Sequence, residues 1–241
     1  MIRPPGLVQS QTAGSAVSRL GAIQISDLTA GYGGPPVLQN FDLDVRSGEF
    51  VYVVGPSGAG KSTLLKLAHG TLRPEKGSIV VDGLLAHRLR RRQTEKVRRQ
   101  VGHVFQTYEL LPYLTALENV LLPLQLTHPR IGNARDYAVD ALELVGLGDR
   151  LKRRPESLSV GEQQRVAVAR AIAAQPRILL ADEPTGNLDS QSTAEIVELF
   201  RQLNGMGSTV LMATHDEMVL SRYPARAVRL RARPGLLEVA S

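Results

Sequence analysis

The fold of this chain is decided by the stretch Phe50-Val-Tyr-Val-Val-Gly55-Pro-Ser-Gly-Ala-Gly60-Lys61-Ser62. Five strand-forming residues lead into a Gly-rich turn, and apolar residues at helical spacing follow it. In such a loop the backbone N–H groups point inward at phosphate oxygens, and the helix adds the positive end of its dipole. The expected phosphate contacts are Gly55, Pro56, Ser57, Gly58, Ala59, Gly60, Lys61, Ser62 and Thr63. Lys61 should reach the terminal phosphates and Ser62 should bind Mg²⁺; the alternative is a purely structural Gly-rich turn.

Two further apolar stretches end in residues suited to the same chemistry. The first, Ile178 to Ala181, is followed by Asp182 and Glu183. Asp182 suits the Mg²⁺ shell, and Glu183 can polarise a water for in-line attack on a γ-phosphate. The second stretch leads to His215, which can hold the γ-phosphate and the attacking water in register. Each feature alone also fits a solvated turn or a structural histidine, but the phosphate loop upstream favours the chemical interpretation.

A fourth motif, Leu158-Ser-Val-Gly-Glu162, precedes a long helical pattern. Serine with glutamate three residues later is also an ordinary capping box. Capping accounts for Ser159 and Glu162 but not for Leu158, Gly161 or the Gln163-Gln-Arg165 that follows.

Strand and helix patterns alternate along most of the chain, which predicts a mainly parallel sheet covered on both faces. The expected strands are 50–54, 79–81, 101–105, 178–181 and 209–213, and the expected helices are 61–68, 116–124, 134–145, 162–174 and 192–203. Near-alternating apolar residues between Ile23 and Val45 predict antiparallel strands joined by the Gly31 to Pro36 turn. The interval of about 106–160 shows helices and prolines without a convincing strand, and predicts an inserted helical lobe.

Composition limits the remaining function classes. The 241 residues are 43% hydrophobic, include no cysteine, and carry a formal net charge of +6. We expect one ordered domain over 21–233, with tails at 1–20 and 234–241. No apolar run is long enough to cross a bilayer, and the lack of cysteine argues against disulfide or thiolate-metal chemistry. The basic clusters around Arg88 to Arg92, Arg98, Arg150 to Arg154 and Arg222 to Arg233 fit a solvated face, an anionic membrane or nucleic acid.

The motifs follow one another in this order: the phosphate loop, Gln106, Leu158 to Glu162, Asp182-Glu183, Asn187-Leu-Asp189 and His215. This ordered set resembles the ABC ATPase cassette, a P-loop NTPase fold. The resemblance covers nearly all of Ile23 to Leu230. The resemblance implies ATP and Mg²⁺ as ligands. It implies that Tyr32 stacks on adenine and that Gln106 contacts Mg²⁺ and acts in catalysis. Ser159, Gly161 and Asp189 are then contacts across a homodimer that forms on ATP binding. Val160 departs from the family pattern, which usually has glycine there.

Finer likenesses lie in the family branch that serves lipoprotein release, macrolide efflux and cell division, and are greatest to the cell-division ATPases. They imply an FtsX-like polytopic membrane subunit as partner and a place on the cytoplasmic face of the membrane. Control of septal peptidoglycan hydrolysis is the implied output. The rivals are an exporter ATPase for lipoproteins or small molecules and a soluble ABC ATPase acting on nucleic acid; we expect no nucleic-acid partner, because tandem cassettes and long coiled coils are missing.

The stretch Thr107 to Leu114 holds two tyrosines and three leucines that no single helical or strand period buries together. We therefore expect some of these side chains to be exposed and to form a docking groove. The resemblance to the ABC cassette implies that this groove receives a short helix of the membrane subunit. The alternative is that Tyr108 and Leu111 are local core of the helical lobe.

Overall fold

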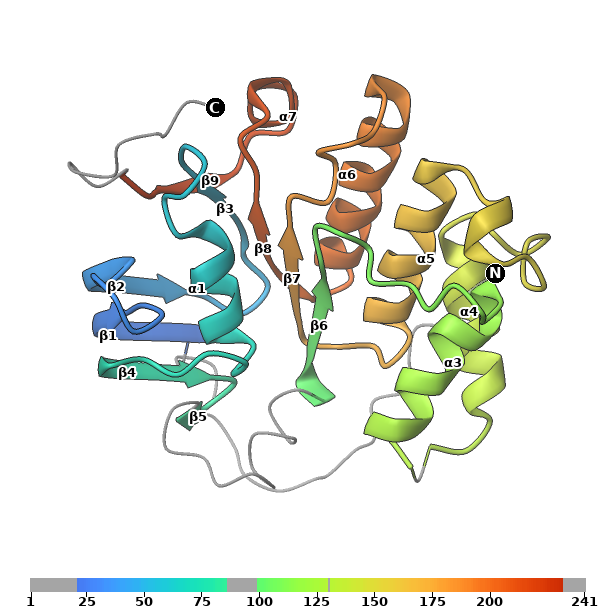
Figure 1. The fold of residues 1–241 in the computed structure, drawn as a ribbon, viewed down its shortest axis with the longest axis horizontal. Helices are drawn as coiled ribbons and strands as arrows, with labels where there is room; N and C mark the ends of the chain where they lie inside the picture. The colour runs from blue at the N-terminus through green and yellow to red at the C-terminus, as the bar shows by residue number, and fades with distance from the viewer. Residues whose placement is uncertain (1–20, 86–98, 130, 232–241) are drawn as a thin grey trace.

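The structure is a computed structural model that describes residues 21–85, 99–129 and 131–231. Two sheets and their helices make up this part of the chain (Figure 1). Both expected tails and the basic residues from Arg88 to Arg92 lie outside the described residues.

A five-stranded parallel sheet forms the centre, in the order β6-β7-β8-β3-β9. The strands are β6 (Val101–Val104), β7 (Ile178–Asp182), β8 (Thr209–Ala213), β3 (Phe50–Val54) and β9 (Arg226–Arg229). The first four are buried along their whole length, as apolar runs covered on both faces should be. Val104 pairs with Ala181, and Asp182 pairs with Ala213, so these strands end at one edge of the sheet.

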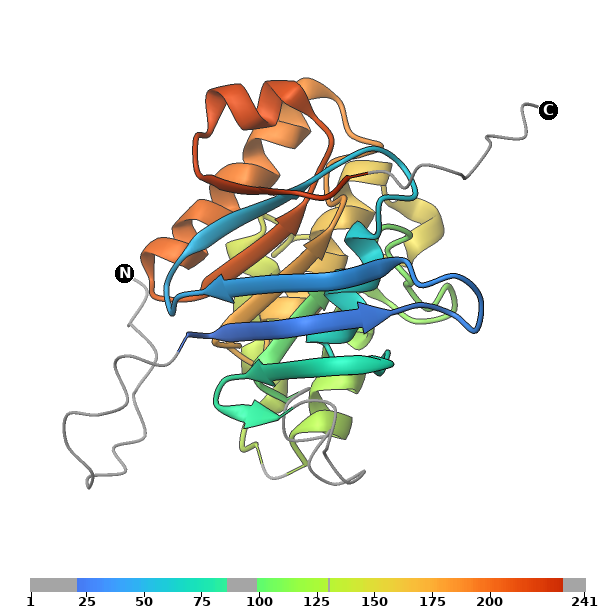
Figure 2. The same cartoon turned by 90° about the vertical axis from the view of Figure 1, so that its left-hand side faces the viewer.

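The N-terminal residues form a second, antiparallel sheet in the order β2-β1-β4-β5, which faces the viewer in Figure 2. Its strands are β1 (Ile23–Ala30), β2 (Leu38–Val45), β4 (Lys76–Val81) and β5 (Leu84–Leu85). The β1–β2 pairing confirms the antiparallel fold predicted from alternation.

Alternate residues of the parallel sheet enter two separate cores. Val51 and Val53 pack with α1 (Lys61–Ala68) and the antiparallel sheet. Tyr52 and Val54 pack on the other side with α5 (Val160–Ile172) and α6 (Ser190–Gly205). The helix that follows the phosphate loop and the helix that follows Ser159 therefore cover opposite faces of one sheet.

Helices connect β6 to β7. These are α3 (Ala116–Thr127), α4 (Ala134–Leu144), the short 3₁₀ turn η2 (Pro155–Ser157) and α5. Helix α3 runs three residues past its predicted end at Leu124 although it contains Pro123. The Thr127 hydroxyl donates to the Pro123 carbonyl at 2.8 Å and helps to close the last turn.

Two helix starts differ from those predicted, and one strand of the parallel sheet was not predicted. Helix α5 begins at Val160, two residues early, because Ser159 is its N-cap and forms a full capping box with Glu162. Helix α6 begins at Ser190, where Asp189 caps it. Strand β9 was not predicted, since its alternating arginines suit a charged edge strand and show no apolar run. No helix in the described ranges is both long enough and apolar enough to span a membrane.

His103 in β6 is an unusual core residue because both ring nitrogens are buried and lack a partner among the described residues. Its ring lies 4.1 Å from the Phe105 ring and 5.0 Å from the His69 ring, between centroids. Burial, with a smaller contribution from the neighbouring His69, Lys66 and Arg170, lowers the pKa of His103 to about 3. The folded protein therefore holds this imidazole neutral.

This burial predicts acid sensitivity. Below the ordinary histidine pKa of about 6.5 the unfolded chain binds a proton that the folded chain refuses. The free energy of unfolding should then fall by up to about 1.4 kcal/mol per pH unit between pH 6.5 and 4.5. When the free energy of unfolding is measured with urea at several pH values in this range, it should fall less per pH unit for His103→Leu than for wild type. An equal fall of the free energy of unfolding per pH unit in both proteins would show that His103 binds the proton in the folded state as well.

Candidate functional site

The phosphate loop connects the end of β3 to α1 in the geometry that an anion requires. Gly60 is the N-cap of α1 with φ +99°, a left-handed conformation that suits glycine, and no side chain caps the helix. The first N–H groups of α1 are thus left for a ligand. Gly55 passes so close to β9 that an added Cβ would lie 2.6 Å from the Leu230 carbonyl oxygen.

Lys61 is 7% exposed and its ammonium lies at the centre of the loop. It donates to the carbonyl oxygens of Gly55 at 2.8 Å and Pro56 at 3.2 Å. It also lies 3.2 Å from the Glu183 carboxylate. The loop's own oxygens and one carboxylate therefore hold the cation where phosphate oxygens can replace them.

Ser62 and Asp182 form a second pair beside the loop. The Ser62 hydroxyl donates to the Asp182 carboxylate at 3.0 Å. The pKa of Asp182 is raised overall. Burial is the main cause of the rise, which the Ser62 hydrogen bond and the two lysines Lys61 and Lys66 oppose. A hydroxyl and a buried carboxylate are oxygen ligands of the type that Mg²⁺ takes alongside phosphate oxygens, so these residues fit that ion.

Glu183 contacts two of the predicted site residues at once. One carboxylate oxygen faces Lys61, and the other lies 2.5 Å from His215 Nδ1. The carboxylate is 11% exposed, whereas the His215 side chain is 67% exposed and opens the site to solvent. Glu183 also has φ +48°, a left-handed conformation that costs an L-residue about 1–2 kcal/mol. Strain of this kind at a buried acid is typical of functional positions.

Two predicted contacts lie at the rim of this group. Gln106 is exposed and follows β6, at the edge where β7 ends in Asp182. Tyr32 is 61% exposed, and its hydroxyl lies 3.4 Å from the Thr63 hydroxyl in the first turn of α1. The Lys66 ammonium is 5.8 Å from the centre of the Tyr32 ring. The aromatic face is thus available beside the phosphate loop.

Ser159, Gly161 and Asp189 form a separate group on the other face of the sheet. Ser159 caps α5, and Asp189 caps α6 through the backbone N–H groups of Gln191 and Ser192. The two helix starts adjoin, because a Cβ on Gly161 would lie 3.4 Å from the Ser192 hydroxyl. The structure therefore does not bring this group to the phosphate loop of its own chain.

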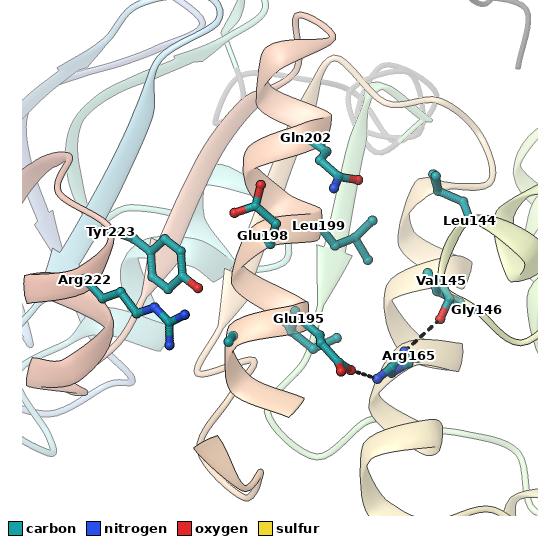
Figure 3. A pocket seen from close by; sticks show the side chains of 12 residues that line it. Leu144, Val145, Gly146, Arg165, Glu195, Glu198, Leu199, Gln202, Arg222 and Tyr223 are labelled. Carbon is teal, nitrogen blue, oxygen red and sulfur yellow. Dashed lines mark hydrogen bonds and ion pairs between the residues drawn. The ribbon is translucent and has the colours of Figure 1, made fainter. Parts of the chain in front are cut away.

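A groove with a volume of about 540 Å³ lies elsewhere, along α6 (Figure 3). Arg165 crosses part of it to pair with Glu195 and approach the Val145 carbonyl. None of the predicted site residues lines this groove.

Two contacts were missed from sequence. Arg170 of α5 and the buried Asn119 of α3 both bind backbone groups of the segment that follows Gln106. The available signal was an arginine within the apolar run Val166-Ala-Val-Ala-Arg170-Ala-Ile172.

The chain is similar to a known protein family and to several of its members. The family model described as "ABC transporter" matches residues 38–186. An uncharacterized ABC transporter ATP-binding protein of Thermotoga maritima is 50% identical over 76% of this chain and 79% of its own. The cell division ATP-binding protein FtsE of Streptococcus pneumoniae is 39% identical over 86% and 91%. The lipoprotein-releasing system ATP-binding protein LolD of Bacteroides thetaiotaomicron is 41% identical over 81% and 90%.

A solved structure shares the fold closely. The ATP-binding cassette MJ0796, solved as a dimer in a post-hydrolysis state bound to ADP and Pi, superposes with a TM-score of 0.80. It is 36% identical, and the match covers 88% of this chain and 97% of that one.

The contacts of Lys61 predict the result of removing it. Lys61→Ala takes away the one ammonium inside the loop, so Mg²⁺-ATP affinity should fall roughly tenfold or more, as for a lost charge-assisted hydrogen bond. Equilibrium titration with a fluorescent ATP analogue measures this. Lys76→Ala, which removes the same charge from an exposed strand start, is the matched control. Equal affinity in all three proteins would show that the loop does not hold phosphate through Lys61.

Proposed function

This chain belongs to the ABC transporter family of ATP-binding proteins, and from that premise we propose that it is the ATPase subunit of a cell-division membrane complex. As a member of the family it hydrolyses ATP with Mg²⁺. The observation that carries ATP-driven pairing of two such subunits is the separation of two helix N-termini, one after the phosphate loop and one after Ser159, on opposite faces of one sheet. The cell-division role itself is supported by the FtsE relatives.

The residues around Glu183 suit hydrolysis in a direct way. The N–H groups of α1 and the Lys61 ammonium bind the phosphates, and Ser62 with Asp182 would hold Mg²⁺. Bound Mg²⁺ supplies charge neutralisation between phosphate oxygens. Glu183 accepts a proton from water, and His215, 2.5 Å from its carboxylate, orients that carboxylate. Gln106 contacts the γ-phosphate from the end of β6.

A dimer follows from the position of Ser159 and Gly161. Their helix start is a second anion-binding end, and it lies across the sheet from the phosphate loop of the same chain. Two copies placed head to tail bring each Ser159 to the other copy's loop, with Asp189 beside it. ATP then joins two chains at two sites, and hydrolysis releases them. The dimeric MJ0796 cassettes are consistent with this arrangement.

The contact with the membrane subunit is proposed at the segment after β6. Tyr113 is 66% exposed, and Leu110, Leu111 and Tyr108 are half-buried. An exposed aromatic beside half-buried leucines is a surface on which an amphipathic helix can dock. We take the occupant to be a short helix of an FtsX-like polytopic partner, on the cytoplasmic face of the membrane.

FtsE relatives support cell division, but the LolD relatives have nearly equal identity. Lipoprotein release is therefore the second candidate. Affinity purification of the tagged chain from its host membranes distinguishes the two: division requires an FtsX-like subunit and release requires LolD-type export partners. Recovery of export partners alone would reject the division role.

Glu183→Gln tests the catalytic proposal. The amide keeps the size of the side chain but cannot accept the water's proton, so ATP hydrolysis should slow by about 10²–10⁴-fold. ATP affinity should stay nearly unchanged, and a closed dimer should accumulate in size-exclusion chromatography with ATP. Glu143→Gln on the exposed side of α4 makes the same chemical change away from the site. Wild-type turnover by Glu183→Gln would remove Glu183 from this role.

Tyr113→Ala tests the docking surface. Loss of a central aromatic anchor typically weakens an interface by about tenfold or more, so co-purification with the membrane partner should drop. ATP binding and thermal unfolding should match wild type. Met206→Ala removes an equally exposed side chain, 61% exposed, at the end of α6. Undiminished partner recovery with Tyr113→Ala would move the docking surface elsewhere.

A further inference from the structure

The segment between β6 and α3 has neither helix nor strand, and its backbone is held by side chains from two helices. Asn119 of α3, 1% exposed, holds the end of the segment: it accepts from the Leu111 N–H at 2.7 Å and donates to the carbonyls of Leu111, Leu114 and Thr115. The start of the segment is held from α5 by Arg170. One Nη donates to the Glu109 carbonyl at 2.6 Å and the other to the Tyr108 carbonyl at 2.5 Å.

The two residues that Arg170 grips have a strained backbone. Tyr108 has φ +55° and Glu109 has φ +49°, so two consecutive L-residues are left-handed. Left-handed pairs of this kind persist only where the surroundings determine them. The planar guanidinium fork fits two adjacent carbonyls at once, which a single ammonium cannot do with the same rigidity. The fork thus supplies an interaction that favours this particular backbone path.

Arg170 lies near the C-terminal end of α5, far from the helix start. Ser159, the N-cap of the same helix, lies about 16 Å away at a rise of 1.5 Å per residue. Helix α5 therefore has one end at the proposed dimer contact and holds the segment after Gln106 near its other end. Residues 166–169 between the two ends are fully buried, so the helix is packed along its length.

We propose that Arg170 is a positioning residue for ATP hydrolysis, which fixes Gln106 relative to α5 by clamping the left-handed backbone at Tyr108 and Glu109. Closure of the dimer on Ser159 then moves α5 and the Gln106 segment as one body. Through Arg170, Gln106 and the docking surface behind it respond both to ATP at the chain's own phosphate loop and, by way of α5, to the ATP of the partner chain that Ser159 contacts. This inference rests on the proposed function for the roles of Gln106 and Ser159.

The test replaces the fork and then removes the strain that it holds. Arg170→Met keeps the length and apolar stem of the side chain but has no donors. Its kcat for ATP should fall by about tenfold or more, with KM within about threefold, because an interaction needed for catalysis is lost while phosphate binding is kept. A purely packing role would change the temperature of unfolding without this split between kcat and KM.

A second substitution separates clamping from packing. Glycine adopts left-handed φ without strain, so Arg170→Met with Glu109→Gly should recover much of the lost kcat. Arg170→Met with Glu109→Ala removes the same carboxylate but keeps the Cβ, and should recover nothing. If Arg170→Met alone does not fold, recovery of folding and turnover by Glu109→Gly supports the clamp, and failure to recover overturns it. Equal rescue by glycine and alanine also overturns it.

Glu183→Gln assayed in parallel separates this inference from the proposed function. Normal kcat in Arg170→Met with a nearly inactive Glu183→Gln rejects the clamp alone. Normal turnover in both variants rejects the catalytic assignment on which the clamp depends.

Discussion

The register of four parallel strands is the constraint on which the site depends. Because β6, β7, β8 and β3 are hydrogen-bonded side by side, the residues one or two positions past their ends meet at one edge. Gln106, Glu183, His215 and the phosphate loop are far apart in sequence, and each begins one or two positions past the end of a buried strand, with Asp182 the last residue of β7. A one-residue shift in the β7–β8 or β8–β3 pairing would exchange the two faces of the shifted strand and separate Glu183 from Lys61.

Much of this could be predicted because each signal was local. A buried strand that ends in polar residues indicated each of three features: the phosphate loop, the acids after Ile178 to Ala181, and the histidine after Thr209 to Thr214. Boundaries of β3, β6, β7 and β8 matched within a residue for the same reason. The roles of the individual site residues stay predictions; the structure shows that Glu183 contacts Lys61 and His215 and that Ser62 contacts Asp182.

What was missed depends on contacts between distant segments. Strand β9 is recognisable as a strand only beside β3, since Arg226 to Arg229 has an edge-strand pattern of charges. In sequence Arg170 is one of many helical arginines, and only the folded chain brings the carbonyls of Tyr108 and Glu109 within its reach. Left-handed φ at Tyr108, Glu109 and Glu183 leaves no mark in sequence either, because none of the three is glycine, the residue that usually signals such a turn.

The two helix starts that we propose as phosphate-binding lie on opposite faces of one sheet, and this placement also determines the kinetics of the proposed dimer. If each site is completed by a second copy, the total rate of ATP hydrolysis by the isolated chain rises with the square of its concentration when it is dilute. A membrane complex that holds two copies replaces that encounter with an effective concentration on the order of millimolar. In this proposal, assembly of two chains in the membrane complex activates ATP hydrolysis. Unassembled subunits then hydrolyse little ATP without any separate inhibitor.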